Sequence, residues 1–262
     1  MQLELVTADP KGQARPTPIL CVHGMWHAAW CWSAHFLPYL AQHAYRAHAL
    51  SLRGHGGSEG RAQLRWTPLR AFVSDVAQVV DQLERPPVLV GHSMGGLIVQ
   101  KYLESHQVPA AVFLASAPPR GLLPATLRMA RRHPLAVLKS VLTLSLIHNV
   151  GTLELYKQAL LSDNVPEHEL KAYHDQIQDE SFRAYLDMLA LDLPRPEKVH
   201  TPLLVLGTKA DNLIACGEVE ATARAYHTQA EFFPGMGHAM MLDAGWQAVA
   251  DRILAWLDAQ GL

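Results

Sequence analysis

The sequence predicts an α/β fold in which one mostly parallel sheet is covered by helices on both faces. Five short apolar runs rich in Val, Ile and Leu are typical of strands buried between helices, and helical patterns fall between these runs. Strands that alternate with helices indicate right-handed crossovers within one parallel sheet. The predicted strands are residues 18–22, 45–50, 87–90, 110–115 and 202–206.

Further strands and three helices complete the predicted core. Residues 3–7 alternate polar and apolar side chains, which is typical of an edge strand, and residues 231–233 are predicted to end a sixth buried strand. Three segments between or after the strands place their apolar side chains on one stripe, as a helix against a sheet requires. These segments are residues 71–83, 94–105 and 246–257.

Residues 120–198 interrupt the alternation. This segment is helical in character, is punctuated by prolines and contains no good strand run. A separate helical domain is one interpretation. We favour a helical cap, because the strand pattern resumes at Pro202 and the new strand needs its earlier partners. The predicted division is therefore a core of residues 1–119 and 199–262 with a cap of residues 120–198.

Composition and charge exclude several classes of protein. The chain has 262 residues, of which 49% are hydrophobic and 18% charged, and its formal net charge is −2. This balance excludes an intrinsically disordered chain, and near-neutrality argues against a nucleic-acid partner. No window approaches the roughly 18 consecutive apolar residues of a membrane span, and the N-terminal stretch lacks the apolar run of a signal peptide. The sequence does not indicate an oligomeric state.

Cysteines and histidines do not indicate a metal site. Cys21, Cys31 and Cys216 have no CxxC spacing, so we expect reduced, mostly buried thiols of a cytoplasmic protein. The chain contains 15 histidines but no HExxH motif. His23 and His27 are four residues apart, but their surroundings suit a loop. We therefore predict neither a bound metal nor a cofactor.

The strongest motif is Gly91-His92-Ser93-Met94-Gly95. It directly follows a predicted strand and directly precedes a predicted helix, which is the context of a nucleophile elbow. In such an elbow the turn is so sharp that the serine adopts strained dihedral angles and its hydroxyl stands above the carboxyl edge of the sheet. The alternative is a glycine-rich turn of purely structural use.

A serine nucleophile needs a base and an acid from later loops at the same sheet edge. His238 lies in a glycine-rich loop after the last predicted strand, and Asp211 follows the strand 202–206. The order serine, acid, histidine along the chain is the expected one. A loop histidine and a turn-forming aspartate are the structural alternatives, and Asp243 and Asp192 are less natural candidates for the acid.

The loop after the first buried strand suits an oxyanion hole. His23 and Gly24 leave that strand, so the backbone amide of Met25 and the amide of Met94, which follows the nucleophile, would point at a developing oxyanion. A tight strand exit is the structural alternative.

With these motifs assembled, the sequence resembles the α/β-hydrolase superfamily over essentially its full length. The stretch from His23 to Trp32 is similar to its small-molecule esterase and hydroxynitrile-lyase branch. The resemblance implies an α/β-hydrolase fold with a mostly parallel eight-stranded sheet, a helical cap and a Ser93–His238–Asp211 triad. Ser51 departs from the aspartate that the family often carries ahead of this turn, and we interpret His55 in the same turn as structural. The matching segments are 23–24, 53–58, 91–96, 207–211 and 237–238.

These features predict a serine hydrolase that cleaves small to medium carboxylic esters through an acyl-enzyme intermediate. The cap is expected to roof Ser93 and to form an apolar pocket, while Trp30 and Trp32 are assigned to core packing. No arginine cluster or phosphate loop stands at the predicted site, although the cap carries Arg128, Arg131 and Arg132, which we assign to a solvated helix face. The predicted pocket residues are Trp26, His92, Met129, Leu142 and Met240.

Other reactions on the same scaffold remain open. Ser93 argues against dehalogenases and epoxide hydrolases, which need an aspartate at the elbow. Ala239 and Met240 after His238 weaken the hydroxynitrile-lyase interpretation, which requires a lysine there. Open alternatives are a lactonase, a thioesterase, an amidase or aminopeptidase, a carbon–carbon hydrolase, a cofactor-free haloperoxidase and a non-catalytic ligand-binding receptor.

Overall fold

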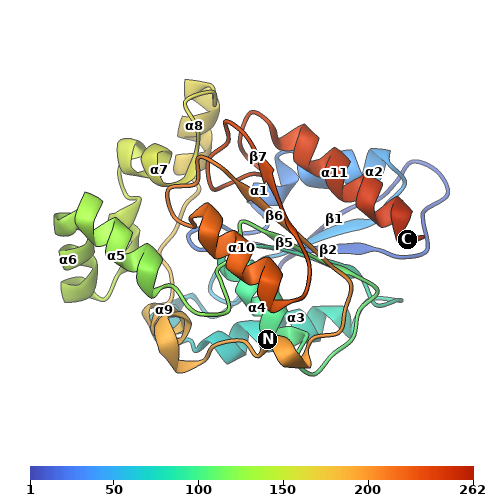
Figure 1. Cartoon of the computed structure of the whole chain (residues 1–262), viewed down its shortest axis with the longest axis horizontal. Helices are drawn as coiled ribbons and strands as arrows, with labels where there is room; N and C mark the ends of the chain where they lie inside the picture. Colours follow the sequence, from blue (N-terminus) through green and yellow to red (C-terminus); the bar gives the residue numbers. More distant parts are fainter.

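A seven-stranded sheet forms the centre of the molecule. The structure is a computed structural model that describes residues 1–262. The strand order is β1-β3-β2-β4-β5-β6-β7; β1 pairs antiparallel with β3, and every other pair is parallel (Figure 1). The strands are β1 (Leu5–Ala8), β2 (Ile19–Val22), β3 (Ala47–Leu50), β4 (Val88–His92), β5 (Ala111–Leu114), β6 (Leu203–Thr208) and β7 (Ala230–Phe233).

The predicted fold class is confirmed, with one strand fewer than the resemblance implied. Every strand run recognised in the sequence forms a strand. The central runs are apolar and buried, whereas β1 and β7 form the two edges of the sheet and are only partly buried, so the sixth strand is an edge strand rather than a buried one. No eighth strand is present, so the sheet begins with β1 pairing directly on β3.

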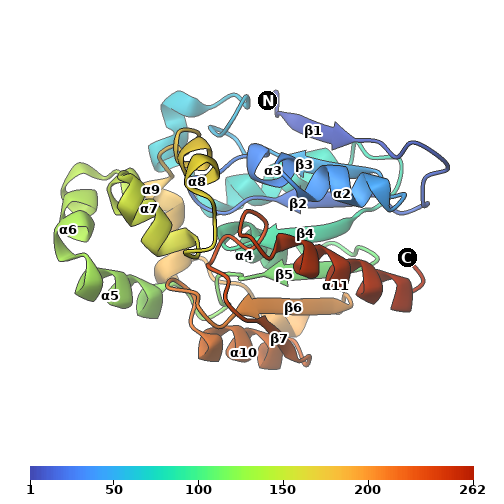
Figure 2. The same ribbon diagram turned by 90° about the horizontal axis from the view of Figure 1, so that it is seen from above.

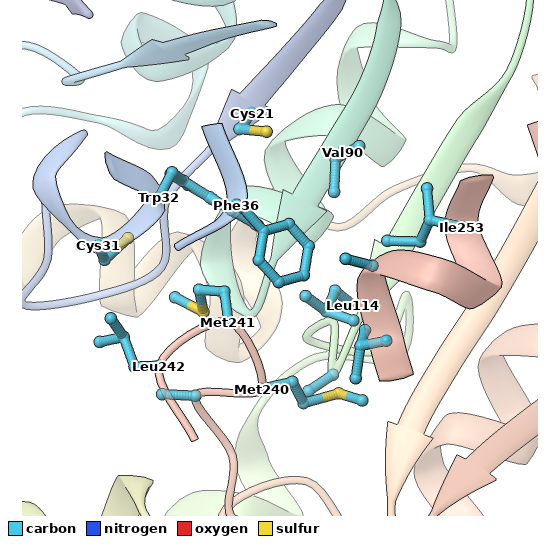
Figure 3. Packing of buried hydrophobic residues seen from close by; sticks show 14 of the residues in the cluster. Cys21, Cys31, Trp32, Phe36, Val90, Leu114, Met240, Met241, Leu242 and Ile253 are labelled. Carbon is cyan, nitrogen blue, oxygen red and sulfur yellow. The ribbon is translucent and has the colours of Figure 1, made fainter. Parts of the chain in front are cut away.

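Helices cover both faces of this sheet (Figure 2). Alternate residues of each strand point to opposite faces, so Cys21 packs with one helical layer and Leu20 with the other. The first layer contains α1 (Trp30–Ser33), α2 (Phe36–Gln42) and α11 (Trp246–Ala259), and the second contains α3 (Leu69–Val80), α4 (Met94–Tyr102) and α10 (Cys216–Ala225). Figure 3 shows part of the first layer, where Trp32 and Phe36 meet Val90, Leu114 and Ile253.

Residues 120–198 contain helices and no strand. This inserted segment comprises α5 (Leu123–Arg132), α6 (Pro134–Thr143), α7 (Leu153–Leu160), α8 (Glu167–His174) and α9 (Phe182–Leu186), with short helical turns at Leu146–Asn149, Asp187–Leu191 and Pro196–Lys198. In both views α5 and α6 project from one end of the molecule, far from α11 and the C-terminus (Figures 1 and 2).

The strand order creates a switch point between β2 and β4. The chain moves from β2 outward to β3 in one direction, and then returns to β4 and continues outward in the other. Connections that diverge in this way leave a crevice at the carboxyl ends of the two central strands, where ligands bind in open α/β sheets. The loops that carry Met25 and Ser93 leave β2 and β4 at this crevice. No helix of the structure combines the length and the apolar character needed to cross a membrane.

Candidate active site

Ser93 occupies a strained turn between β4 and α4. Its backbone has φ 52° and ψ −118°. This conformation is energetically unfavourable for a residue other than glycine, and it persists only where the surrounding packing holds the backbone in place. The packing here is tight, because a Cβ added to Gly95 would lie 2.3 Å from the carbonyl oxygen of Val22. The Ser93 carbonyl accepts hydrogen bonds from the amides of Gly96 and Ala117, each at 3.0 Å. The turn thus has the geometry of the predicted elbow.

His238 and Asp211 form a buried hydrogen-bonded pair. The Nδ1–H of His238 donates to Oδ2 of Asp211 at 2.7 Å, and each side chain is 1% exposed. The other carboxylate oxygen of Asp211 accepts from the backbone amides of Leu213 at 2.7 Å and Ile214 at 2.9 Å. These two amides fix the rotamer of the carboxylate, and the carboxylate in turn fixes the tautomer of the imidazole.

Because Nδ1 is hydrogen-bonded to Asp211, Nε2 is the ring nitrogen of His238 that is left for another partner. This nitrogen is buried and has no hydrogen-bond partner, so the bond from Ser93 to His238 is not formed in this structure. The ring lies 4.8 Å from that of His92, the residue before Ser93, and His92 Nε2–H donates to the carbonyl of His238 at 3.0 Å. His238 is therefore held against the elbow with a free basic nitrogen.

Two backbone amides beside the elbow have no acceptor in the chain. Neither the Met25 nor the Met94 amide donates a hydrogen bond within the protein. The loop after β2 packs directly on the elbow, because a Cβ on Gly24 would lie 2.9 Å from Cβ of Ser93. Met94 is also the first residue of α4, so its amide points out of a helix N-terminus, where negative charge is favoured.

Three further histidines under the site are fully buried. Burial lowers the pKa of His27 to about 3, with a further contribution from His238, and lowers the pKa of His23 and His92 well below 6.5. All three are therefore neutral at pH 7. The Leu52 amide donates to Nε2 of His23, whose Nδ1–H donates to the Gly24 carbonyl. His23 and His92 thus hydrogen-bond to backbone groups of the loops, whereas His27 bonds to the Tyr156 hydroxyl at 3.1 Å.

An apolar cavity opens above Ser93. Its volume is about 80 Å³, and 12 of its 16 lining residues are hydrophobic. Ser93, Met25 and Trp26 contribute from the sheet edge, and Leu213 and Ile214 from the loop after β6. The inserted segment supplies the rest of the wall, from α5 and the residue before it, α6, α9 and the short helical turn at Leu146–Asn149. The buried hydroxyl of Ser140 and Oδ1 of Asn149 are the two atoms of this wall without hydrogen-bond partners.

Of the five predicted pocket residues, Trp26 and Met129 line this cavity and three do not. Leu142 is 75% exposed, because α6 turns Val137 and Val141 toward the cavity instead. Met240 is fully buried in the core beside Leu114 (Figure 3). His92 is 1% exposed and lies beneath the elbow, where it holds the His238 loop. The structure thus places these three side chains away from this cavity.

Two residues of α9 also line the cavity, although the sequence did not predict them. Phe182 and Tyr185 reach the cavity from about 90 residues beyond Ser93. Their alternation with buried Ala184 on a short helix resembles ordinary core packing, so no sequence signal distinguishes them.

The turn at residues 53–58 is structural and links the core to the inserted segment. A buried hydrogen bond of 3.1 Å joins His55 to Glu180 of the insert. Where the family often has an aspartate, Ser51 donates to the carboxylate of Glu4, which also accepts from the Gly57 amide at 3.0 Å. A carboxylate from a different part of the chain thus binds this turn.

The two fallback acids have other partners. Asp243 accepts from the amides of Ser162 at 2.7 Å and Gly237 at 3.0 Å, which ties the His238 loop to the end of α7. Asp192 pairs with Lys101 at 2.7 Å. Neither acid bonds to His238. No group of three or more His, Cys, Asp or Glu side chains could hold a metal ion.

Comparison with known proteins shows the family of the chain. A sequence model described as "Alpha/beta hydrolase family" matches residues 19–252. The chain belongs to the alpha/beta hydrolase family. Among curated relatives, Esterase PIR7B from Oryza sativa subsp. japonica is 37% identical over 108 residues, or 38% of each chain. Pyrethroid hydrolase from Sphingobium wenxiniae is 28% identical over 102 residues, covering 38% of this chain and 36% of that protein. The chain therefore matches little more than a third of their length.

Solved structures of the same fold cover nearly the whole chain. An esterase from Exiguobacterium antarcticum superposes with a TM-score of 0.73 at 18% identity, over 98% of this chain and 95% of that one. The monoacylglycerol lipase of Paleococcus ferrophilus gives a TM-score of 0.74 at 20% identity, over 99% and 100%. At this level of identity the likeness concerns the fold.

Proposed function

We propose that this alpha/beta hydrolase is a serine esterase acting on small to medium carboxylic esters with an apolar acyl or alcohol part. The observation that carries the proposal is the His238–Asp211 pair, whose free basic nitrogen is buried at the elbow of Ser93. The apolar cavity supports an uncharged substrate, since no Lys, Arg, Asp or Glu lines it. Relatives named as esterases support the reaction class.

In the proposed reaction, Ser93 Oγ attacks the ester carbonyl while Nε2 of His238 accepts its proton. Asp211 holds the tautomer and stabilises the imidazolium that forms. The amides of Met25 and Met94 bind the oxyanion of the tetrahedral intermediate. The imidazolium then protonates the leaving alcohol, and water repeats the sequence to release the acid and the free serine.

The same proposal assigns residues 120–198 the role of a cap. Their helices α5, α6 and α9 supply eight of the 16 residues that line the cavity, and the Ala239 amide of the His238 loop donates to the carbonyl of Leu160 in α7 at 2.8 Å. The inserted segment thus lines the proposed substrate cavity and is also hydrogen-bonded to the His238 loop.

Substitution of the nucleophile tests the proposal. Ser93→Ala should lower the hydrolysis of p-nitrophenyl butyrate by about 10³-fold or more, because the attacking group is removed, while circular dichroism and Tm stay close to those of the parent protein. A fluorophosphonate should label the parent and fail to label this variant. Ser74→Ala, an exposed serine on α3, is the control and should behave like the parent.

Retained turnover in the Ser93 variant would overturn the assignment. A panel of acetyl, butyryl and octanoyl esters, measured beside lactones, thioesters and amides, identifies the bond that is cleaved. Preference for any of these other substrates over all esters would replace ester hydrolysis with another serine-dependent reaction.

A further inference from the structure

The outer surface of α5 and α6 carries a concentration of exposed apolar side chains. Nine large hydrophobic residues of the whole chain are exposed, and six of them lie within residues 123–142, at 50–80% exposure. Such a cluster of apolar side chains is expected in a protein core or at an interface rather than on a surface that faces water. We call these six residues the α5–α6 face: Leu123, Leu127, Leu135, Leu138, Leu142 and, at its edge, Val141, which also lines the cavity.

The same two helices are strongly cationic. Residues 120–153 contain five Arg or Lys residues and no Asp or Glu, whereas the whole chain has a net charge of −2. Arg128 pairs with Glu218, and Arg132 donates to Asn212 at 2.8 Å. Arg131 and Lys139 are exposed and have no acidic partner, so their charge is available beside the apolar side chains.

The pattern on α6 separates two faces of one helix. Leu135, Leu138 and Leu142 follow the spacing of three and four residues that brings side chains to the same side, and Lys139 lies next to them. Val137 and Ser140, on the opposite side, line the cavity above Ser93. One surface of α6 therefore serves the cavity, while the other is apolar, cationic and open to solvent.

We propose that the α5–α6 face docks on an anionic lipid surface. An apolar stripe flanked by Arg and Lys is the composition with which helices lie at a lipid interface, where apolar side chains enter the acyl boundary and cations contact anionic headgroups. A second copy of this chain fits less well, because two-fold pairing of this face would bring Arg131 and Lys139 of both copies together. The position of α5 and α6 at one end of the molecule leaves this face unobstructed (Figures 1 and 2).

If the α5–α6 face docks on lipid, the two helices that form one wall of the cavity lie directly on the lipid surface. Ala125 and Met129 of α5 and Val137 of α6 line the cavity from these same helices. An apolar ester dissolved in the lipid would then reach Ser93 past these helices without first crossing water. This delivery of substrate rests on the proposed esterase function, whereas the docking itself does not.

Vesicle flotation tests the docking. The Ser93→Ala protein, mixed with vesicles of phosphatidylcholine and phosphatidylglycerol, should float with them, and pure phosphatidylcholine vesicles should bind it less. Leu135→Ser/Leu138→Ser should reduce the bound fraction by at least about tenfold through lost apolar insertion. Arg131→Glu/Lys139→Glu should reduce it similarly, and about 1 M NaCl should weaken binding of the parent protein by screening.

Matched substitutions elsewhere are the controls. Leu191→Ser removes an apolar side chain that is 69% exposed outside these helices, and Lys198→Glu reverses an exposed charge. Both should bind vesicles like the parent. With Ser93 intact, the two double variants and the two controls should hydrolyse a water-soluble ester at the parent rate, because none of their substituted residues lines the cavity. Reduced turnover of vesicle-borne ester, with soluble-ester turnover unchanged, is the expected result for the two double variants.

Three outcomes overturn the proposal. The first is an absence of parent binding to anionic vesicles, and the second is equal binding by Leu135→Ser/Leu138→Ser. The third is a dimer, seen by light scattering, that becomes a monomer in that variant without any vesicle binding, which would assign the face to a second copy. Failure of ester hydrolysis alone leaves the vesicle result intact, so the two hypotheses fail separately.

Discussion

The two sides of the cavity are built in opposite ways. On the sheet side, the loops that follow β2, β4, β6 and β7 carry buried polar side chains that are joined by hydrogen bonds, as in the pairs of Asp211 with His238 and of His92 with the His238 carbonyl. We refer to these as the strand-end loops. On the insert side, α5 and α6 present apolar side chains to the cavity and others to solvent.

This difference indicates a division of labour. The buried polar groups of the strand-end loops can adopt few arrangements, because each buried donor and acceptor needs a hydrogen-bond partner. The α5–α6 wall makes mostly non-directional contacts, which change with little penalty when side chains change. We infer that the strand-end loops carry out the proposed reaction. We infer further that α5 and α6 select the ester and, through the α5–α6 face, dock on the lipid that contains it.

The largest expected effect is on the strand-end loops. Asp211→Asn should lower kcat by about 10³- to 10⁴-fold, because an amide no longer selects the imidazole tautomer with a free basic Nε2. Asp192→Asn, which alters an acid paired with Lys101 instead, is the control and should leave kcat unchanged. Steady-state kinetics with a p-nitrophenyl ester measures both. An unchanged kcat in Asp211→Asn would assign the histidine's orientation to other contacts.

A smaller but still severe effect should follow from filling the elbow. Gly95→Ala should lower the free energy of unfolding by about 3 kcal/mol or more, because the new methyl would lie 2.3 Å from the Val22 carbonyl oxygen, and neither strand nor helix can move away easily. Gly217→Ala on α10 is the matched control: nothing lies near its added methyl, so helix propensity should raise stability by about 0.5–1 kcal/mol. Chemical denaturation measures both variants, and equal stabilities would contradict the rigid elbow.

The buried histidines should make stability fall in acid. The folded pKa of His27 is about 3 against an ordinary value of 6.5, so below pH 6.5 the unfolded chain binds a proton that the folded chain does not, and stability falls as the pH falls. At pH 5 this amounts to about 2 kcal/mol for His27. His27→Phe should remove that part of the difference in unfolding free energy between pH 7 and pH 5. An unchanged difference would mean that His27 is not held neutral by its surroundings.

The smallest expected effect is on the insert side. Ala125→Leu narrows the apolar cavity from α5, so kcat/KM for an octanoyl ester should fall about tenfold while the acetyl ester is unaffected. Leu127→Ala, on the same helix but 50% exposed, should change neither value. Equal losses for both esters in Ala125→Leu would indicate that α5 affects the reaction as well as the choice of substrate.

Local sequence was informative wherever a short segment determines its own structure. The apolar runs predicted all seven observed strands, and the helices at 69–80, 94–102 and 246–259 fall within a few residues of their predicted bounds. The elbow was recognisable because its glycines, serine and flanking strand and helix are contiguous. His238 and Asp211 were identified from their loops and chain order, and the structure brings these two together.

The pocket could not be predicted as well, because it depends on the rotation of helices about their axes. Both sides of α6 are apolar, so the sequence does not reveal that Val137 faces the cavity and Leu142 faces solvent. Met240 lies only two residues after His238, yet its side chain points into the core. Likewise, the carboxylate that binds the 53–58 turn comes from Glu4, which is distant in the sequence, because Ser51 stands where the family often has an aspartate.

By itself, the sequence determined the order of strands and helices and the residues at the strand ends, because periodicity and turn chemistry act over a few neighbouring residues. Only the tertiary structure decided which surfaces of the inserted helices face the cavity and which face water. That choice depends on how segments about 90 residues apart, such as α9 and the turn after β4, are brought to the same cavity, and no local pattern contains it.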